Sequence, residues 1–491
     1  MILNSILKVV IVIAILTIMI NVMLAVFVVF SERRKPSSTW AWLLVLCFIP
    51  VFGFIIYMVF GRDSKREKLF ADKDKFDTDL YFDYLLKNES AMKKVKWQKA
   101  AIENKQDITK FKYLNDFLYL NVNTGNWLTD NNRVKRFVDG NEKFETLIND
   151  IKRAKEFIHI EYYIMRNDNL GKRLVKELAQ KAKEGVEVRI LYDGMGCMEL
   201  PSNFFDELRE AGGYAVAFLP RLMIRINYRN HRKICVIDGK IGYIGGFNIG
   251  DEYLGIVKRY GKWRDTHLKI EGDAVDHLQM RFIMDWNFTA KDYKVSIDEK
   301  YFPKKIDFQG VKMQIVSSGP DTQWKNIRNA YFKMINEAED HIYITTPYFV
   351  PDDSIFTALK VAALSGIDVR VIFPGNPDHL FVYWASMSYL GALLEAGVKC
   401  YQYEKGFIHS KYMSIDGIVS TVGTANMDIR SFAVNFETNA FIFDEEITKT
   451  LELDFEKDLD SCLEITMNWY NNRKWWFRLK ESVARLISPI L

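Results

Sequence analysis

Two copies of one short pattern, HxKxxxxD, hold the residues of this sequence whose types and spacing best suit chemistry. The copies consist of His231, Lys233 and Asp238, and of His409, Lys411 and Asp416. Each copy is followed by a glycine-containing turn and an amide, Asn248 in the first case and Asn426 in the second. Lys and Asp each occupy about one position in fifteen, so seven histidines would produce roughly 0.03 copies by chance. Two copies therefore indicate a functional constellation.

These residue types suit the cleavage of a phosphodiester, which is a poor electrophile shielded by negative charge. One neutral imidazole could attack phosphorus while a second, protonated imidazole donates a proton to the departing oxygen. We expect the two lysines, with Asn248 and Asn426, to hold the nonbridging oxygens and stabilise their developing charge. No metal ion or other cofactor is expected, because the lysines supply the positive charge. The sequence also lacks an HExxH motif and clustered ligands at zinc spacing.

A nucleophilic imidazole also needs a carboxylate on its other nitrogen to fix its tautomer. Asp238 and Asp416 follow apolar strand residues, and we expect them to support the turn of each motif rather than the ring. Asp265 in the first half of the chain and Glu437 in the second are predicted to orient the histidine of their own half. The alternative is that both are surface or capping acids.

Two further histidines help to test the pattern. His267 has a lysine at the right spacing, but position 274 is alanine and no glycine-rich turn with asparagine follows, so we interpret it as structural. His379 lies in a loop after a predicted strand, where ligands often bind. It is a weaker candidate for contact with substrate.

Both motif copies lie in an internal duplication with a period of about 180 residues. The apolar strand at 157–163 has its counterpart at 342–348, and the strand at 185–191 has its counterpart at 366–372. These runs alternate with helical patterns, which predicts βαβ units around a mostly parallel sheet in each half. Two such halves predict a pseudo-twofold axis with a shared site at the interface.

The chain before the duplication begins with two apolar runs. Val9–Phe30 carries no charge and is just long enough to cross a bilayer, and a second apolar run covers Trp40–Phe60. We therefore divide the chain into a transmembrane hairpin at 1–60, a linker with early helices at 61–130, and the two halves at 131–310 and 311–491. The alternative for the first run is a cleaved signal peptide.

Composition limits the class of protein and its location. The chain of 491 residues is 49% hydrophobic and 26% charged, as in a globular protein with local apolar segments. Its net charge of +4 does not indicate a basic groove for nucleic acid, so no nucleic-acid partner is expected. Five scattered cysteines without a CxxC pair fit a reducing compartment. Basic residues flank both apolar runs and weakly favour a cytoplasmic body.

Taken together, these motifs resemble the phospholipase D superfamily and, within it, the bacterial cardiolipin synthases of the Firmicutes type. Further stretches that carry the resemblance are Glu32–Pro36, Thr39–Leu44, Ile160–Tyr163, Gly245–Tyr253, Ser317–Asp321 and Ser488–Leu491. The resemblance implies an α/β fold, with an N-terminal transmembrane helical hairpin followed by a phospholipase D-like pseudodimer of two α/β/α sandwich halves.

The resemblance also implies a reaction. His231 would attack one phosphatidylglycerol and release glycerol, forming a phosphatidyl-histidine, and a second phosphatidylglycerol would then resolve the intermediate to cardiolipin. His409 would act first as acid and later as base. The implied partners are phosphatidylglycerol and cardiolipin in an anionic membrane of the cell. A basic and aromatic segment at 473–480 has the composition of an interfacial helix, with a helix that packs against the domain as the alternative.

Other functions use the same residue types. A phospholipase D that hydrolyses its lipid, or a nuclease on the same scaffold, would need the same motifs, because the outcome depends on which hydroxyl resolves the intermediate. The apolar N-terminus and the near-neutral body disfavour the nuclease. An inactive membrane scaffold is the third alternative. The sequence leaves the oligomeric state open.

Overall fold

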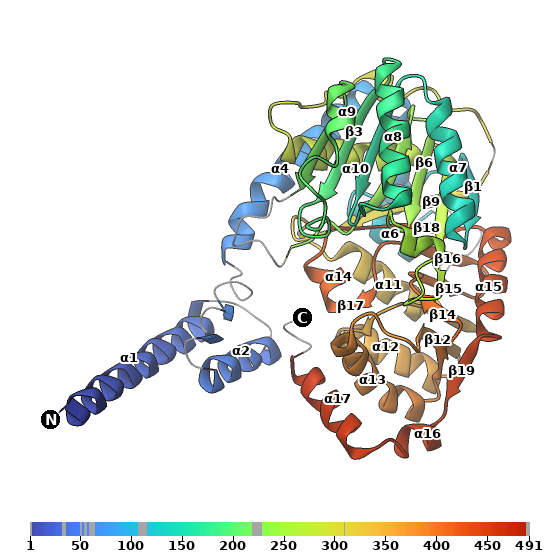
Figure 1. The fold of residues 1–491 in the computed structure, drawn as a ribbon. Helices are drawn as coiled ribbons and strands as arrows, with labels where there is room; N and C mark the ends of the chain where they lie inside the picture. The colour runs from blue at the N-terminus through green and yellow to red at the C-terminus, as the bar shows by residue number, and fades with distance from the viewer. Residues whose placement is uncertain are drawn as a thin grey trace.

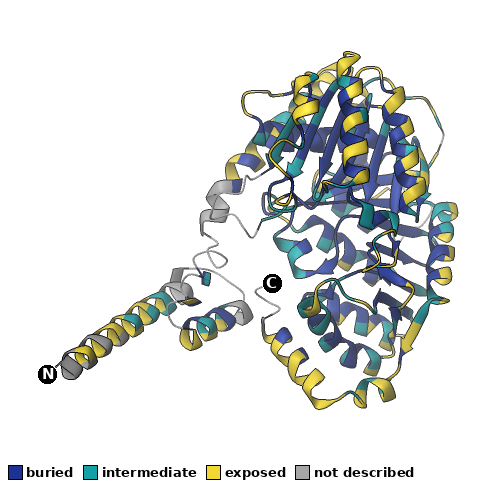
Figure 2. Cartoon of the chain, viewed as in Figure 1, coloured by how far each residue is buried: buried dark blue, intermediate teal, exposed yellow. Residues whose placement is uncertain are grey.

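The computed structural model describes residues 2–31, 36–49, 52–53, 56–57, 64–106, 115–218, 228–308 and 310–487. Two N-terminal helices, α1 (Ile2–Ser31) and α2 (Pro36–Phe48), lie outside the α/β body (Figure 1). Apolar side chains along α1 are exposed, including Ile13, Ile18 and Met23 (Figure 2).

The predicted membrane hairpin is tested only in part. Within the described ranges, no helix is long and apolar enough to cross a membrane. Residues 58–63 of the predicted second span and its flank are outside these ranges, as are Glu32–Lys35 and Ser488–Leu491 of the stretches quoted above.

Three helices connect the N-terminus to the body, where the sequence predicted a linker with early helices. They are α4 (Ser64–Lys87), α5 (Glu89–Glu103) and α6 (Asn115–Asn123). All three contribute buried side chains, for example Phe70 in α4, Val95 in α5 and Phe117 in α6. The described part of this region therefore packs as part of the body.

The first half of the body contains a seven-stranded sheet in the order β1-β8-β6-β5-β2-β3-β4. Its strands are β1 (Asn132–Phe137), β2 (Phe157–Tyr162), β3 (Glu187–Asp193), β4 (Tyr214–Phe218), β5 (Lys233–Ile237), β6 (Ile241–Gly245) and β8 (His267–Gly272). The helical segments of this half are α7 (Gly140–Arg153), α8 (Asn169–Lys183), α9 (Asp206–Glu210), η2 (Asp251–Leu254), α10 (Ala274–Thr289) and η3 (Glu299–Tyr301).

The second half repeats this order in an eight-stranded sheet, β19-β13-β12-β10-β15-β16-β18-β9. Its strands are β9 (Lys312–Ser318), β10 (His341–Thr345), β12 (Asp368–Pro374), β13 (Lys399–Tyr403), β15 (Tyr412–Ile415), β16 (Val419–Gly423), β18 (Glu437–Phe443) and β19 (Cys462–Ile465). Its helices are α11 (Asn326–Glu337), α12 (Asp353–Leu364), α13 (Leu380–Glu395), α14 (Ile429–Ala433), α15 (Glu445–Leu459), α16 (Met467–Asn471) and α17 (Trp475–Ile487), and a short pair joins β11 (Phe349–Val350) to β17 (Met427–Asp428).

The duplication is confirmed, but the prediction of mostly parallel sheets is wrong. Strands β2, β3 and β4 are parallel, as are β10, β12 and β13, and these are the βαβ units that the sequence pattern indicated. The remaining pairs in both sheets are antiparallel, because β5–β6 and β15–β16 are hairpins rather than crossover units. Both sheets are therefore mixed.

The two sheets face each other across a shared core. Ile234 and Val236 of β5 belong to the same buried cluster as Val422 of β16 and Ile442 of β18. Helices α10 and α15 contribute Trp286 and Phe455 to that cluster. Separate cores lie on the outer faces, with α7 and α8 over the first sheet and α11 to α13 over the second. Each half thus has helices on both faces of its sheet, as the α/β/α prediction required.

Candidate active site

Each motif histidine is anchored by its backbone to the opposite half. His231 precedes β5, and its N–H donates to the carbonyl of Phe436 at 2.9 Å. His409 precedes β15, and its N–H donates to the carbonyl of Arg264 at 2.7 Å. Strand β7 (Lys262–Arg264) also pairs with β14 (Gly406–Ile408) across the halves. Backbone hydrogen bonds between the two halves therefore hold the chain at both histidines.

This docking exchanges the orienting carboxylates between the halves, which corrects our pairing. His231 Nδ1 lies 3.0 Å from both carboxylate oxygens of Glu437, and His409 Nδ1 lies 2.7 Å from Asp265 Oδ2. Each acid lies beside the histidine of the opposite half, whereas the sequence led us to pair it with the histidine of its own half. The reason is geometric, because Glu437 follows Phe436 and Asp265 follows Arg264, the residues that receive the backbone of the opposite motif.

Both carboxylates are fully buried and held by further hydrogen bonds. Thr424 Oγ1 donates to Glu437 Oε2 at 2.6 Å, and Asn435 Nδ2 donates to Oε1 at 3.2 Å. The backbone N–H of Thr266 donates to Asp265 Oδ1 at 2.7 Å. Gly246, in the glycine-rich turn after the first motif, lies so close that a Cβ atom there would be 1.9 Å from Asp265 Oδ1. The turn needs glycine because the carboxylate occupies that space.

Both motif histidines line one cavity of about 600 Å³. Asn248 and Asn426 line it as well, and so does the weaker candidate His379. Asn248 is fixed by donating to Tyr253 Oη at 3.0 Å and by accepting from the N–H of Ile164 at 3.2 Å. The structure thus brings both imidazoles and both amides together.

The motif lysines are buried next to their histidines. Lys233 Nζ donates to the carbonyl of His231 at 2.8 Å, and Lys411 Nζ donates to the carbonyl of His409. Burial, with Lys411 nearby, lowers the pKa of Lys233 to about 7. Burial lowers the pKa of Lys411 to about 8, although carboxylates including Asp265 act against it. Both lysines therefore titrate close to neutral pH.

The imidazoles are neutral near pH 7 in the free protein. Burial is the main reason that the pKa of His231 falls to about 4, with Glu437 opposing the shift and Lys233 adding to it. Burial and Lys411 likewise lower the pKa of His409 to about 4, against the attraction of Asp265. A neutral ring is the form that a nucleophile requires.

The motif aspartates lie at the far end of the motif strands. Asp238 accepts hydrogen bonds from the N–H groups of Lys155, Glu156 and Phe157, at the start of β2. Asp416 accepts from the N–H groups of the residues at 339–341 in the same way. The two aspartates support the motif turns, as the sequence led us to expect, and neither lines the cavity.

Several cavity residues were not found by sequence reasoning. Four arginines line the cavity, namely Arg166, Arg229, Arg259 and Arg430. Aromatic rings flank both histidines, with Tyr163 4.8 Å from His231 and Trp263 5.3 Å from His409, measured between ring centroids. Arg229 and Trp263 were detectable in principle, because each stands two residues before a residue already selected. The other arginines are scattered, and no spacing distinguishes them.

One group of three residues has the geometry of a metal site. In the portion of the chain that the structure covers, these are Asp77, Asp285 and Asp321, whose ligand atoms lie within 4.8 Å of one another. They do not line the cavity that holds the histidines.

Comparison with known proteins agrees with the geometry. A family model described as cardiolipin synthase, PLD-like domain, matches residues 147–286 and 331–459, and one described as phospholipase D-nuclease N-terminal matches 19–62. The chain is 47% identical to the major cardiolipin synthase ClsA of Bacillus subtilis, over 96% of this chain and 97% of that protein. It is also 47% identical to cardiolipin synthase of Listeria monocytogenes, over 97% of this chain and 98% of that protein.

A solved structure shows a similar fold. Phosphatidylserine synthase of Haemophilus influenzae covers 77% of this chain and 100% of its own, with a TM-score of 0.61 and 13% sequence identity. At that identity the likeness concerns the fold. Together with the family model and the close relatives, the paired motifs on one cavity place this chain in the cardiolipin synthase family of phospholipase D-like proteins.

Proposed function

We propose that this protein transfers a phosphatidyl group from one phosphatidylglycerol to another, giving cardiolipin and glycerol through a phosphatidyl-histidine intermediate. The observation that carries the proposal is that His231 and His409 line one cavity while each Nδ1 is bound to a carboxylate of the opposite half. Because Nδ1 is engaged, Nε2 is the nitrogen of each ring that would act on phosphorus or on the exchanged proton. The cardiolipin synthases to which the chain is similar support the choice of lipid.

In the first step, Nε2 of His231 bonds to phosphorus, and the bond between phosphorus and the glycerol oxygen breaks. His409 donates the proton that the leaving glycerol needs, and it then takes a proton from the hydroxyl of the second phosphatidylglycerol. That oxygen displaces His231 and completes cardiolipin. His409 must be protonated for the first step although its pKa is about 4 in the free protein. The negative charge of the bound phosphodiester would raise that pKa.

The surroundings of the cavity suit an anionic substrate. Arg229 and Arg430 line it together with the amides of Asn248 and Asn426. We assign these groups, with the positive charge of Lys233 and Lys411 behind the histidines, to the nonbridging oxygens of the phosphodiester. Val350 and Val382 provide apolar lining for the adjoining part of the lipid.

Incubation of the detergent-solubilised protein with phosphatidylglycerol alone tests this function. Cardiolipin and glycerol in equal amounts, followed by chromatography and mass spectrometry, are the expected products. Phosphatidic acid as the main product would show a hydrolase instead, and the absence of turnover would reject both activities. The variants H231N and H409N should each abolish product formation.

We further propose that residues 1–60 anchor the protein in the cell membrane as two spans, with the body on the cytoplasmic side. The uncharged run Val9–Phe30 and the exposed apolar side chains of α1 support this assignment. Retention in the membrane after washing with alkaline carbonate, and cleavage of the body by trypsin in inverted but not right-side-out vesicles, are the expected results. Release by carbonate or the opposite protease pattern would contradict it.

We propose α17 as a second membrane contact. Most of α17 is exposed (Figure 2). Its side chains Glu481 and Ala484 are buried, whereas Trp475, Leu479 and Leu486 are exposed by 70%, 56% and 66%. The same segment carries the basic residues Lys474, Arg478, Lys480 and Arg485, and anionic headgroups complement that charge. We thereby assign the two roles that the sequence left open to different faces of one helix.

The contact can be measured with a variant that lacks the N-terminal hairpin. Deletion of residues 1–60 and flotation with vesicles of phosphatidylglycerol or of phosphatidylcholine should show binding to the anionic vesicles. The change W475S/L479S should remove that binding. The exposed Trp324 lies outside α17, so W324S is the matched control and should bind as before. Equal flotation of all three proteins would reject this role for α17.

A further inference from the structure

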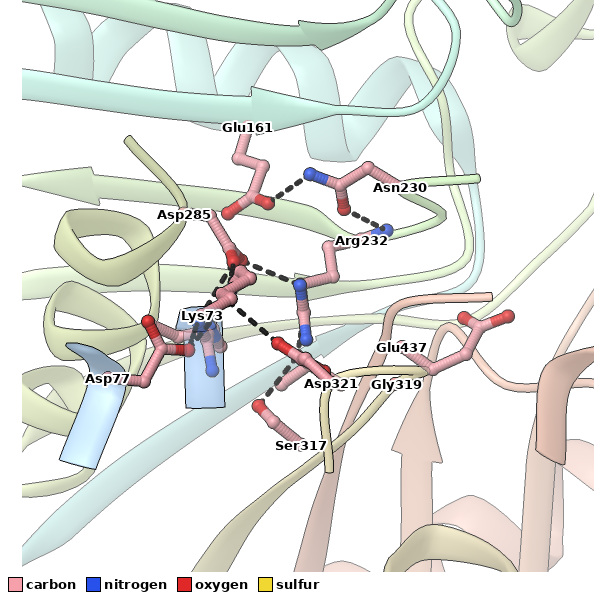
Figure 3. Close-up of polar contacts among 12 residues, drawn as sticks. Lys73, Asp77, Glu161, Asn230, Arg232, Asp285, Ser317, Gly319, Asp321 and Glu437 are labelled. Carbon is pink, nitrogen blue, oxygen red and sulfur yellow. Dashed lines mark hydrogen bonds and ion pairs between the residues drawn. The ribbon is translucent and has the colours of Figure 1, made fainter. Parts of the chain in front are cut away.

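A lysine outside the duplicated halves occupies the centre of a buried charge cluster (Figure 3). Lys73 of α4 is fully buried, and its Nζ lies 2.6 Å from Asp77, 2.9 Å from Asp285 and 2.7 Å from Asp321. These are the three carboxylates that could otherwise ligate a metal ion. Burial and Arg281 lower the pKa of Lys73, but the three carboxylates outweigh them and the pKa is raised overall. The ammonium group is therefore charged and lies among these three carboxylates.

The cluster is balanced in charge and continues to the first motif. Asp285 also binds Arg232, the residue between His231 and Lys233, with Nη1 to Oδ2 at 2.6 Å. Arg281 completes the cluster through Asp77 and Asp285, at 2.6 and 2.8 Å. Three cations thus face three carboxylates. Burial and Asp285 raise the pKa of the neighbouring Glu161 to about 8, so this fourth buried carboxyl group is mostly neutral at pH 7. Removal of any one charge leaves a buried charge uncompensated, which is costly.

The same lysine reaches the strand that carries Glu437. Its Nζ lies 5.8 Å from the centroid of the Phe436 ring, and the Arg232 guanidinium lies 5.3 Å from that ring. Phe70, one turn before Lys73 in α4, packs edge-on against the same ring at 5.4 Å. Phe436 accepts the backbone N–H of His231 and is followed by Glu437, the partner of its imidazole.

The second motif has different surroundings at the matching position. Ser410 follows His409 where Arg232 follows His231, and its Oγ lies 2.7 Å from Thr266 Oγ1. The guanidinium next to this hydroxyl pair comes from another position, because Arg264 Nη1 donates to Thr266 Oγ1 at 3.0 Å and Arg264 pairs with Asp458 of α15 at 2.8 Å. The duplication is symmetric in its motifs, but α4 supports one of the two imidazoles.

From this geometry we infer that Lys73 is a positioning residue for the His231–Glu437 pair. Its ammonium joins α4, the Asp285 carboxylate of α10 and the Asp321 turn into one rigid support behind Phe436. The role rests on the proposed function, since it concerns the histidine assigned to attack phosphorus. It also makes the helix that follows the N-terminal region a part of the active-site scaffold.

The test separates positioning from charge balance by comparing K73M with K73M/D321N. The single variant leaves a net buried negative charge and should lower both the melting temperature and kcat. The double variant has two arginines facing two carboxylates, so its melting temperature should return close to that of the wild type. Its kcat should stay at least tenfold below the wild type with an unchanged KM for phosphatidylglycerol, because methionine cannot bridge α4 to the support.

Lys94 provides a matched control, because it also pairs with two carboxylates, Asp130 and Asp273, at 3.1 and 2.6 Å. The variant K94M should keep kcat within twofold of the wild type. Recovery of kcat together with stability in K73M/D321N would show that Lys73 only balances charge, and would overturn the inference. Failure of the double variant to fold would also overturn the inference. Lys73 would then be needed for folding itself, even with the buried charges balanced. An inactive wild type would instead refute the proposed function.

Discussion

Each imidazole in the cavity depends on a carboxylate that is fully buried and comes from the opposite half of the chain. An acceptor on Nδ1 fixes the tautomer and leaves Nε2 for chemistry. The arrangement is that of a nucleophile or acid oriented by a third group, repeated twice around one substrate position. It follows that a change to one carboxylate acts on the histidine of the other half.

Replacement of either carboxylate by its amide tests this exchange. We expect E437Q and D265N each to lower kcat by at least about 100-fold, the usual contribution of a positioned proton-transfer group. The amide keeps the shape of the side chain, so the melting temperature should change little. In a rapid quench with radiolabelled phosphatidylglycerol, E437Q should accumulate less labelled protein, because His231 is the ring that it weakens. Near-normal turnover of both variants would contradict the assignment.

The same residues predict how stability depends on pH. Both histidines have a pKa of about 4 when folded and an ordinary value of 6.5 when unfolded, so the unfolded chain binds more protons between these values. The contribution of each histidine to stability is therefore fully present above about pH 6.5 and is lost as the pH falls toward 4, by roughly 3 kcal/mol for each histidine. Denaturant unfolding at several pH values should show this loss.

The variant H231Q/H409Q provides the comparison for that experiment. It removes both titrating rings, so its stability should fall less between pH 6.5 and 4 than that of the wild type. An equal loss in the two proteins would mean that other groups cause the pH dependence.

At the scale of the element, each motif strand, β5 or β15, lies between the motif histidine at one end and the motif aspartate at the other. The histidine end faces the cavity, and the aspartate end holds the start of the neighbouring strand. Asp238 has φ = 51° and Asp416 has φ = 55°, in the left-handed region, where aspartate and asparagine are enriched among the residues other than glycine. The equal length of the two motif copies thus reflects the length of one strand between the histidine and the turn that its aspartate supports.

Variants of Asp238 should therefore affect stability rather than chemistry. D238A removes the acceptor for three backbone N–H groups and should destabilise the fold by about 1–3 kcal/mol. D238N keeps one acceptor oxygen and tolerates the positive φ, so its loss should be smaller. KM and kcat per folded molecule should remain unchanged in both. A tenfold loss of kcat in folded D238N would show that the aspartate takes part in the reaction.

The sequence predicted the elements and motif residues that recur, but it did not predict how the strands pair or how the two halves dock. The βαβ units were visible because apolar runs alternate with helical patterns, and the motif residues were visible because they recur. The antiparallel hairpins were not predicted, since the polarity of a strand pair is not encoded in strand periodicity. The pairing of Asp265 and Glu437 was wrong because it depends on how two halves dock, which leaves no local signal. Lys73 is a single lysine in a lysine-rich helix, and nothing in its neighbours marks it as buried.

The two halves form one structural unit at the scale of the whole molecule. Their sheets share a core that includes α10, α15 and part of α4, and backbone hydrogen bonds cross the interface next to both histidines. We expect the body to unfold in a single cooperative transition. Calorimetry of the solubilised protein should show one peak for the body, with a calorimetric enthalpy equal to the van't Hoff enthalpy. Two separate peaks would mean that the halves are independent domains.

The exchange of carboxylates also has a consequence for how such a chain could have arisen. A lone ancestral half would have held a histidine without its acid and an acid without its histidine. Such a half would need a second copy beside it, so pairing of two separate copies before fusion of their genes would account for the exchange. After fusion, the sequences of the two halves could differ at positions where the opposite half accommodates the change. Ser410 and Arg232 record such a divergence at matching positions on the two sides of one substrate.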